Sequence, residues 1–300
     1  MPEESPRILI TGANGFVGRH LIAALQAKED VQIFAATHAI AENSLNTGGD
    51  RPIVQALLDI TNAAATLRLL VDIRPTHIVH LAARASGADA DREAVFAVNV
   101  EGTRHLLQAA RSLAEPPRTL LVSTGYVYGN TDAERPARES DPVASSGKFG
   151  AYTDSKIAME TLAAEYGNLA ISVRAFSHTG PGQAPTFAIP AFARQLARIE
   201  RGYQDPEIMV GNLEARRDLL DVRDVVKAYV LLLQWGVPGE TYNVANGAPV
   251  SMREILDRLR ALCTTPTEVH IDPKRLRPAD IACSSGDALK LRMVTGWQPR

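Results

Sequence analysis

The sequence predicts an α/β fold: a Rossmann-type doubly wound parallel sheet with a smaller C-terminal substrate-binding lobe. Three observations predict it. Short apolar segments alternate with helical segments over the first 175 residues. A glycine-rich turn at residues 11–18 joins the first apolar segment to the first helix. The alternation then stops after Phe176, where the loop at 180–182 opens a more irregular region.

The first half of the chain supplies the strands and helices of the sheet. The expected strands are short apolar runs, typical of parallel strands that are buried on both faces. The expected helices repeat apolar residues every three or four positions, so that Val17, Leu21 and Leu25 share one face. Alternation of this kind favours right-handed crossovers. The strands are expected at 7–11, 31–36, 53–57, 77–81, 119–123 and 170–174, and the helices at 16–28, 63–73, 95–113 and 151–166.

The second half of the chain lacks the regular alternation of strand and helix segments. We expect a helix at 189–201, a charged and irregular segment at 211–221, and a strand at 241–245. Asp221 can cap a helix that runs to Trp235, and Ser251 with Glu254 forms a capping box for the next helix. We therefore expect a first domain at 1–175 and mainly a second lobe at 176–300, with a strand within 240–246 returning to the main sheet.

Composition excludes several classes of function. The formal charge of −2 gives no reason to expect nucleic acid or an anionic membrane as a partner. Cys263 and Cys283 have no metal-type spacing, and the seven histidines form no metal-binding pattern, so we expect reduced thiols and no metal. The polar N-terminus resembles no signal peptide, and the apolar stretch around 225–235 is broken by Lys227. We expect a cytoplasmic protein.

The glycine-rich turn predicts a dinucleotide site. Gly12, Gly15 and Gly18 are spaced three apart between a strand and a helix. In such a turn the glycines allow a tight bend, close approach of a pyrophosphate, and close packing of helix on strand. The first helical turn, which contains Phe16 and Val17, then offers free N–H groups to the anion.

The end of the second expected strand bears on the choice of cofactor. An acidic residue there would bind the ribose hydroxyls and repel a 2′-phosphate, but this strand ends at Thr37 and His38. These two residues either accept a 2′-phosphate or belong to a loop, and we favour NADPH slightly over NADH. Asp59, followed by Ile60, either reaches the adenine edge or caps the next helix.

A second motif predicts proton transfer to or from an alcohol or ketone. Tyr152 and Lys156 are four residues apart, so they lie on one face of the expected helix. A nearby ammonium is expected to lower the pKa of the phenol from about 10 toward neutrality. Thr124, at the end of a strand, can hydrogen-bond the reacting oxygen. The alternative is that Tyr152 and Lys156 are a chance pair on a solvated helix surface, but the dinucleotide turn earlier in the chain favours the catalytic interpretation.

Five motifs together resemble the extended short-chain dehydrogenase/reductase family, and the resemblance covers nearly the whole chain. They are TGANGFVG at 11–18, HLAA at 80–83, NVEGT at 99–103, STGYVYG at 123–129 and YTDSK at 152–156. The resemblance implies enzymes that act on nucleotide sugars with NAD(P). It also implies that Leu81, Ala82 and Ala83 line the cofactor site.

Three further stretches are similar to the branch of the family that acts on GDP-mannose, at 173–183, 211–226 and 295–299. The likeness is greatest to reductases of GDP-4-keto-6-deoxy-D-mannose, which make GDP-D-rhamnose (GDP-6-deoxy-D-mannose), a precursor of polysaccharides such as lipopolysaccharide. Dehydratases of this branch have a Glu two residues after the catalytic Thr, and here that position is Tyr126. The missing carboxylate favours simple ketone reduction over dehydration.

The resemblance also implies roles for individual residues. Tyr152 would donate a proton to the C4 oxygen, Lys156 would hold the nicotinamide ribose, and Thr124 would orient the carbonyl. Arg217 and Arg277 match positions that contact the pyrophosphate of the GDP-sugar, and bidentate guanidinium groups suit that task. The remaining substrate-site candidates are Tyr126, Ser177, which stands where relatives often have Asn, and Phe192, which either borders the base or belongs to the core.

Several alternatives stay open at this point. Another nucleotide-sugar enzyme on the same scaffold, a 4-epimerase or a 4,6-dehydratase, would use the same motifs. A non-catalytic NAD(P)-binding regulator is more remote, because this chain keeps both Tyr152 and Lys156. The resemblance also implies a homodimer through the helices of NVEGT and YTDSK. The apolar face of Val95, Val98, Leu106 and Leu107 suits either that interface or packing on the sheet.

Overall fold

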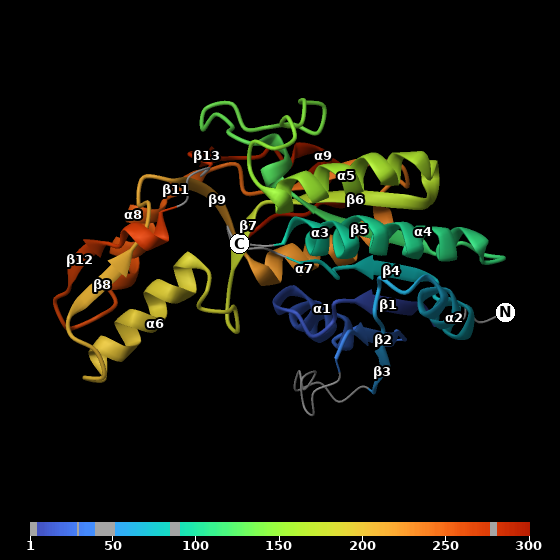
Figure 1. The fold of residues 1–300 in the computed structure, drawn as a ribbon, viewed down its shortest axis with the longest axis horizontal. Helices are drawn as coiled ribbons and strands as arrows, with labels where there is room; N and C mark the ends of the chain where they lie inside the picture. The colour runs from blue at the N-terminus through green and yellow to red at the C-terminus, as the bar shows by residue number, and fades with distance from the viewer. Residues whose placement is uncertain (1–4, 29, 40–51, 85–90, 277–280) are drawn as a thin grey trace.

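The computed structural model describes residues 5–28, 30–39, 52–84, 91–276 and 281–300. It has a large domain built on a wide sheet and a smaller lobe to one side of it (Figure 1). The glycine-rich turn and the YTDSK motif both belong to the large domain.

The large domain contains a seven-stranded sheet in which every neighbouring pair of strands is parallel. The strand order is β10-β6-β5-β4-β1-β2-β3, so the direction of winding reverses between β1 and β4. This topology confirms the predicted doubly wound fold and puts a switch point at the carboxyl ends of β1 and β4. The strands are β1 (Arg7–Thr11), β2 (Gln32–Thr37), β3 (Ile53–Leu57), β4 (His77–His80), β5 (Arg118–Thr124), β6 (Ala170–Ala175) and β10 (Thr241–Val244).

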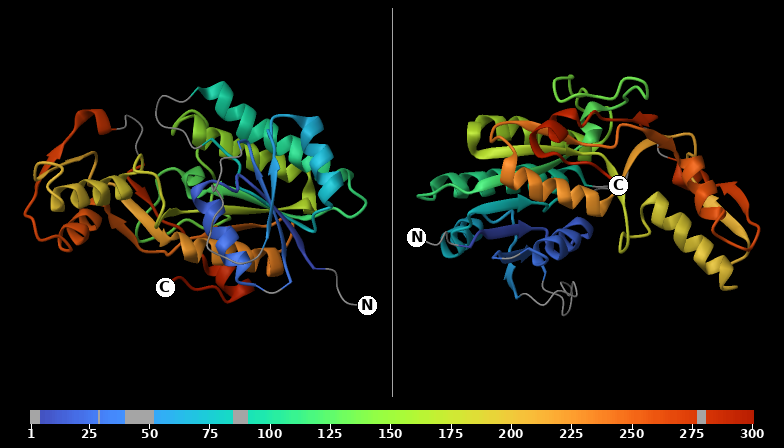
Figure 2. Two further views of the ribbon diagram at one scale, coloured as in Figure 1. Left: turned by 90° about the horizontal axis from the view of Figure 1, so that it is seen from below. Right: turned by 180° about the vertical axis from the view of Figure 1, so that it is seen from behind.

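Helices cover both faces of this sheet (Figure 2). On one face, α1 and α7 contact each other and α9 contacts α7, and one apolar core joins them to the strands. On the other face, α2 packs on α4, and α5 packs on β5. The bounds are α1 (Phe16–Gln26), α2 (Ala63–Ile73), α3 (Arg92–Phe96), α4 (Gly102–Ser112), α5 (Ala151–Glu165), α7 (Val222–Trp235) and α9 (Leu289–Thr295).

The helix expected at 95–113 is longer and is interrupted. It begins at Arg92, because the side chain of Asp91 caps it by accepting hydrogen bonds from the N–H groups of Glu93 and Ala94. A π turn at Ala97–Glu101 separates α3 from α4. The side chains of Leu106 and Leu107 are fully buried against strands of the sheet, with Val98 partly buried beside them, so this part of the apolar face packs on the sheet; Val95 is fully buried as well.

The smaller lobe has its own sheets and helices. Its larger sheet joins β11, β9 and β13, and β7 also pairs with β9, while β8 and β12 form a parallel pair. Phe192 is buried in the core of this lobe, so the core alternative holds for this residue. The elements are β7 (Ser177–Thr179), α6 (Ala188–Glu200), β8 (Glu207–Val210), β9 (Arg216–Asp221), β11 (Pro249–Ser251), α8 (Met252–Arg260), β12 (Glu268–Ile271) and β13 (Cys283–Ser284).

The expectation of an irregular segment at 211–221 holds for 211–215 but is wrong for 216–221, which form β9, the strand that pairs with β7, β11 and β13 of the smaller lobe. One of its inward-facing residues is the charged Asp218, whose side chain is fully buried. The carboxylate accepts three backbone N–H groups, from Asn246 at 2.7 Å, Gly247 at 2.8 Å and Gly286 at 3.2 Å. Asp218 therefore ties β9 to the loops that follow β10 and β13.

The C-terminal segment returns to the large domain. The indole of Trp297 is fully buried, and its Nε1–H donates to the backbone carbonyl of Asp224 in α7 at 2.9 Å. Asp221 caps α7 as expected, and the capping box of Ser251 and Glu254 is present at α8. None of the helices in the described part of the chain is long and apolar enough to cross a membrane.

Candidate active site

The glycine-rich turn lies at the switch point of the sheet and has no room for larger side chains. Gly12 has a φ of +68°, and a Cβ there would lie 2.7 Å from the backbone N of Ala82. A Cβ on Gly18 would lie 2.5 Å from the carbonyl oxygen of Ala13. Both separations are far below van der Waals contact, so only glycine lets the turn pack against the segment that follows β4 and lets α1 pack against the turn.

The N-terminus of α1 is prepared for an anion. Gly15 is the N-cap residue, no side chain caps the helix, and its first turn contains no acidic residue. The positive end of the helix dipole and the first N–H groups are therefore open to a phosphate. Phe16 and Val17 both pack against the core, and the Phe16 ring also stacks on the imidazole of His178 with centroids 6.2 Å apart. His178, which the sequence analysis did not single out, thus borders this anion site.

A buried histidine, His80, contacts the first residue of the glycine-rich turn, Thr11. Thr11 Oγ1 lies 2.7 Å from Nδ1 of His80, and Nε2 of His80 lies 3.0 Å from Thr103 Oγ1. Because Thr103 donates its hydroxyl to the carbonyl of Asn99, Nε2 carries the proton and Nδ1 accepts. Burial, followed by the charge of Lys156, lowers the pKa of His80 to about 3, so the ring is neutral. His80 belongs to the HLAA motif, but no role was predicted for it.

The rest of HLAA lies beside the turn. The N–H of Leu81 donates to the carbonyl of Thr11 at 3.1 Å, and the N–H of Ala82 donates to Thr11 Oγ1 at 3.2 Å. Ala83 follows as an exposed residue at the carboxyl end of β4. The structure thus brings the predicted cofactor residues of two separate motifs to one edge of the sheet.

The residues predicted for the adenine end also come together. Thr37 ends β2, and its hydroxyl donates to the carbonyl of Ala39 at 3.0 Å. Asp59 is exposed. A hydrogen bond from the Thr61 hydroxyl is the largest cause that lowers the pKa of the Asp59 carboxyl, and the nearby His38 lowers this pKa further. Asn62, not Asp59, caps α2, so the capping alternative for Asp59 is wrong. The Ile60 side chain is buried in the core.

Tyr152 and Lys156 lie in the first turns of α5, facing the end of β5. The Lys156 ammonium lies 6.0 Å from the centroid of the Tyr152 ring and donates to the carbonyl of Val122 at 2.7 Å. The hydroxyl of Thr124 hydrogen-bonds Tyr152 and accepts the N–H of Tyr126 at 3.3 Å. Lys156 and Thr124 are largely buried, which excludes the alternative of a solvated surface pair.

The expected lowering of the Tyr152 pKa is wrong for this structure. Burial, followed by the neighbouring Tyr126, raises the pKa of Tyr152 to about 12, although the hydrogen bond from Thr124 acts in the opposite direction. Burial also lowers the pKa of Lys156 from 10.5 to about 8. A protonated phenol at neutral pH suits a proton donor better than a proton acceptor.

Asn99, in the π turn, holds the start of α5 in place. Its side-chain amide donates to Ser155 Oγ at 2.9 Å, and Ser155 Oγ donates to the carbonyl of Tyr152 at 2.7 Å. Its carbonyl oxygen accepts the N–H of Arg84 at 2.8 Å. The π turn therefore connects the loop after β4 to the catalytic helix. The NVEGT motif was the available signal for this residue.

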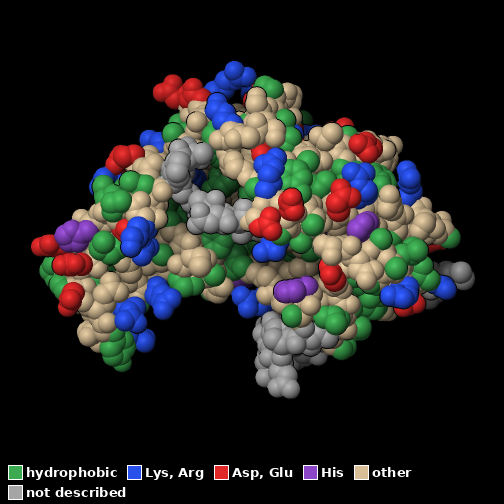
Figure 3. Space-filling model, viewed as in Figure 1, with side chains coloured by type: hydrophobic (Ala, Val, Ile, Leu, Met, Phe, Trp, Pro, Cys, Tyr) green, Lys and Arg blue, Asp and Glu red, His purple; other side chains and the backbone are tan. Residues whose placement is uncertain are grey.

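Three of the predicted substrate residues converge from different elements. The Tyr126 hydroxyl lies 3.3 Å from Ser177 Oγ, and the guanidinium carbon of Arg217 lies 5.9 Å from the Tyr126 ring centroid. Ser177 and Arg217 come from β7 and β9, which pair with each other. Arg277 lies outside the described residues. The surface is hollowed between the large domain and the smaller lobe, with basic side chains on both sides (Figure 3).

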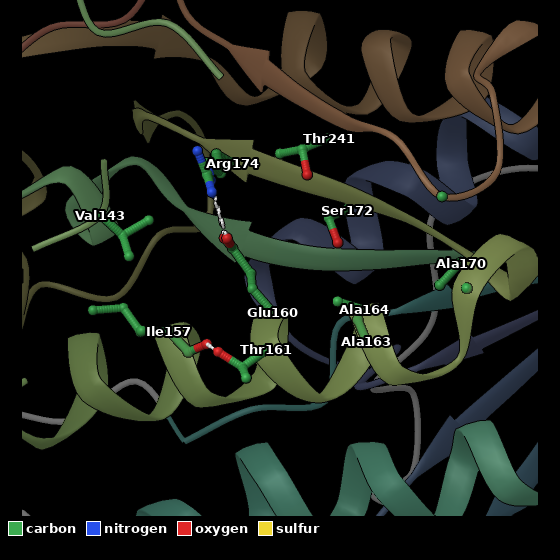
Figure 4. Close-up of a pocket in the computed structure, with 12 residues that line it drawn as sticks. Val143, Ile157, Glu160, Thr161, Ala163, Ala164, Ala170, Ser172, Arg174 and Thr241 are labelled. Carbon is green, nitrogen blue, oxygen red and sulfur yellow. Dashed lines mark hydrogen bonds and ion pairs between the residues drawn. The ribbon is translucent and has the colours of Figure 1, made fainter. Parts of the chain in front are cut away.

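A cavity of about 280 Å³ lies elsewhere, between α5 and the strands β6 and β10 (Figure 4). Its lining includes an ion pair in which Nη2 of Arg174 lies 2.7 Å from Glu160. Nη1 of Arg174 also donates hydrogen bonds to the Tyr128 hydroxyl and to the carbonyl of Glu139. None of the predicted site residues lines this cavity.

The burial of Lys156 predicts a pH-dependent stability. The unfolded chain keeps this proton up to a pH near 10.5, whereas the folded chain loses it above about 8. Between these values the unfolded state binds more protons, so the free energy of unfolding contributed by Lys156 rises with pH. We expect urea denaturation to show the wild type gaining ~3 kcal/mol relative to Lys156→Met over this range. Parallel curves for the two proteins would contradict the burial of a charged ammonium.

Comparison with known proteins identifies the family. The model of the NAD-dependent epimerase/dehydratase family matches residues 8–245. This chain belongs to that family. The NAD-dependent epimerase/dehydratase family comprises nucleotide-sugar-modifying, NAD(P)-dependent enzymes, which confirms the resemblance carried by the sequence motifs.

Within the family, this chain is similar to several enzymes that act on GDP-linked sugars. GDP-6-deoxy-D-mannose reductase from Pseudomonas aeruginosa is 32% identical over 305 residues, covering 98% of this chain and 92% of the relative. GDP-6-deoxy-D-talose 4-dehydrogenase from Aggregatibacter actinomycetemcomitans is 27% identical, covering 97% and 91%. The solved structure of RMD from Pseudomonas aeruginosa complexed with NADPH is 30% identical, with a TM-score of 0.80 over 98% of this chain and 94% of that one. GDP-mannose 4,6-dehydratases and UDP-glucose 4-epimerases of the family also match.

Proposed function

We propose that this protein reduces the C4 ketone of GDP-4-keto-6-deoxy-D-mannose to GDP-D-rhamnose, with NADPH or NADH as the reductant. The observation that carries the proposal is the phenol of Tyr126 beside the pair of Tyr152 and Thr124. A carboxylate at this position is what a dehydratase uses to remove the C5 proton, and a phenol is a poor base for that step. The names of two similar enzymes support a GDP-linked 6-deoxy sugar.

The candidate site fits a nicotinamide dinucleotide. The turn at Gly12 and Gly18 leaves no space for side chains, and the uncapped start of α1 offers N–H groups to a pyrophosphate. Thr37 and His38 would lie at the adenine end, where the last residues of β2, as the structure describes them, include no acidic side chain to bind the ribose hydroxyls and repel a 2′-phosphate. This supports NADPH over NADH. A reduced nicotinamide bound there would supply the hydride for the ketone.

The residues of the chain would then complete the reduction. Tyr152, protonated at neutral pH, donates its proton to the C4 oxygen as negative charge develops on it. Thr124 donates a hydrogen bond to the same oxygen and so stabilises the charge. Lys156 holds the ribose hydroxyls and stabilises the phenolate that remains on Tyr152. Arg217 binds the diphosphate of the substrate through its guanidinium group.

The test is oxidation of the dinucleotide by the proposed substrate. A GDP-mannose 4,6-dehydratase would generate GDP-4-keto-6-deoxy-D-mannose from GDP-mannose, and the loss of NADPH or NADH absorbance would be followed. We expect one reduced dinucleotide to be consumed for each ketone, and none with GDP-mannose alone. NMR of the product would then assign the configuration at C4.

The same assay separates the alternatives. A 4-epimerase would interconvert sugars without net consumption of the reduced dinucleotide, and a dehydratase would turn over GDP-mannose itself. Absence of oxidation with both dinucleotides would sink the reductase proposal. We also infer a homodimer, but its interface must lie outside the apolar face that Leu106 and Leu107 bury in the chain itself. Sedimentation would test it.

A further inference from the structure

A buried ion pair connects the catalytic helix to the sheet. Arg174 of β6 and Glu160 of α5 point toward each other (Figure 4), and Nη2 of Arg174 lies 2.7 Å from Oε2 of Glu160. Nε of Arg174 also donates to both carboxylate oxygens, at 3.2 and 3.1 Å. The two side chains are only 9% and 11% exposed. Because the cost of burying two charges can exceed the gain from their attraction, stability alone explains the pair poorly.

Arg174 also contacts the turn that follows β5. Its Nη1 donates to the Tyr128 hydroxyl at 2.8 Å, and its guanidinium carbon lies 4.7 Å from the centroid of the Tyr128 ring. Tyr128 is the last residue of the 3₁₀ turn Gly125–Tyr128, which contains Tyr126 and has Thr124 as its N-cap residue. One guanidinium group therefore contacts both α5 and the turn that begins after Thr124.

Glu160 lies one helical turn after Lys156, on the same face of α5. The Lys156 ammonium donates to the carbonyl of Val122 in β5, and Glu160 pairs with Arg174 of the neighbouring strand β6. Two successive turns of α5 are therefore attached to two adjacent strands. Burial lowers the pKa of Lys156 to about 8, and the negative charge of Glu160 opposes that lowering. Glu160 thus acts on Lys156 through its charge as well as through its place on the helix.

We propose that Arg174 is a positioning residue of the candidate active site, which holds α5, through Glu160, at a fixed place relative to the turn at Gly125–Tyr128. This inference rests on the proposed function. In that reaction the proton donor Tyr152 belongs to α5, and Thr124, which would orient the same substrate oxygen, begins the turn. Displacement of a reacting group by about 1 Å can slow a reaction by about 10²-fold, so a residue that acts only through its neighbours can still control the rate.

The test compares Arg174→Lys and Tyr128→Phe with the wild type. Arg174→Lys keeps the positive charge but lacks the fork that contacts both partners at once. Tyr128→Phe removes the hydroxyl that accepts from Arg174 and donates to Asn243. At saturating substrate and reduced dinucleotide, we expect single-turnover reduction to be about 10- to 100-fold slower in Arg174→Lys and about threefold to tenfold slower in Tyr128→Phe. The affinity for the reduced dinucleotide should stay within about threefold of that of the wild type, because the glycine-rich turn is unchanged.

A second measurement needs no turnover. Amide hydrogen exchange of the free protein, followed by mass spectrometry, would report on the turn and on the start of α5 separately. We expect both segments to exchange faster in Arg174→Lys, and the turn alone to exchange faster in Tyr128→Phe, at a temperature at which each variant is folded.

Tyr242→Phe is the matched control. Its hydroxyl is also buried and accepts the N–H of Val237 at 3.0 Å, and no hydrogen bond found among the described residues joins it to α5 or to the turn. This variant should melt at a lower temperature than the wild type, but its single-turnover rate and the hydrogen exchange of the two segments should be unchanged.

Single-turnover rates of Arg174→Lys and Tyr128→Phe equal to that of the wild type would overturn the inference, even if both variants melt at a lower temperature, because the pair would then only stabilise the fold. Unchanged hydrogen exchange at both segments in Arg174→Lys would contradict it as well. A rate loss in Tyr242→Phe as large as that in Tyr128→Phe would show that the effect is not specific to the turn. A wild type that oxidises no reduced dinucleotide with the ketone would sink the proposed function, and this inference with it.

Discussion

Replacing Tyr152 with Phe is expected to lower kcat for ketone reduction by about 10²- to 10⁴-fold, the range in which general acid catalysis contributes. In the proposed reaction the phenol gives its proton to the C4 oxygen, and Thr124 would keep its hydrogen bond to the substrate when the phenol is lost. The variant should still bind the reduced dinucleotide, since Lys156 is held by the carbonyl of Val122 and does not depend on Tyr152 for its position. Single-turnover measurement with saturating substrate would isolate the chemical step.

Tyr126→Phe serves as the control for loss of a neighbouring phenol. Its hydroxyl contacts Ser177 at 3.3 Å, and the variant keeps the ring beside Arg217. We expect this variant to retain most of its turnover. If Tyr126→Phe lost as much activity as Tyr152→Phe, the assignment of the proton donor to Tyr152 would be wrong.

Removal of the Asp218 carboxylate is expected to destabilise the fold by ~3–5 kcal/mol. The hydrogen bond from Gly286 is buried and those from Asn246 and Gly247 are part-buried, and each unsatisfied buried donor costs about 1–3 kcal/mol. Asp218→Ala leaves all three donors unsatisfied, whereas Asp218→Asn keeps one acceptor and should lose less. Urea denaturation at neutral pH would measure both.

Asp221→Ala is the control for an aspartate on the same strand. Asp221 is exposed enough for water to replace it. Its carboxylate caps α7 by accepting the N–H of Arg223 at 2.8 Å, and it forms a half-exposed ion pair with the Arg223 guanidinium at 2.6 Å. We expect a loss of about 1 kcal/mol, typical of an N-cap. A loss for Asp218→Ala no greater than that for Asp221→Ala would show that the buried carboxylate does not hold the lobes together.

The central strands of the large sheet, such as β4, β5 and β6, were predictable because burial on both faces makes them largely apolar. The segment at Arg216–Asp221 was not, since one of its inward positions is occupied by Asp218 and its sequence looks like a charged loop. A buried aspartate that accepts backbone N–H groups from distant loops leaves no local signal. The π turn at Ala97–Glu101 was missed for a similar reason, because Asn99 is held by Ser155 and Arg84, which lie outside its own helix.

The motifs correctly located the candidate site, but they did not predict the hydrogen-bond partners and pKa values of its residues. The spacing correctly predicted that Tyr152 and Lys156 share one face of α5. The Lys156 ammonium, however, donates its hydrogen bond to the carbonyl of Val122, and burial is the largest cause of the pKa shifts of both residues. His80 and His178 were missed as individual residues, although both lie inside quoted motifs. Their contacts come from elements that are distant in the sequence, so only the folded chain defines their roles.

The return of the chain from the smaller lobe has a consequence for how the protein is made. The edge strand β10, the covering helix α7 and the buried Trp297 all belong to the large domain, yet they are synthesised after residue 220. The first 175 residues therefore leave the ribosome as an incomplete sheet, with the face that α7 covers still open to water. The large domain can close its core only when nearly the whole chain is available, because the elements of the smaller lobe are translated in two stretches, one before α7 and one between β10 and α9.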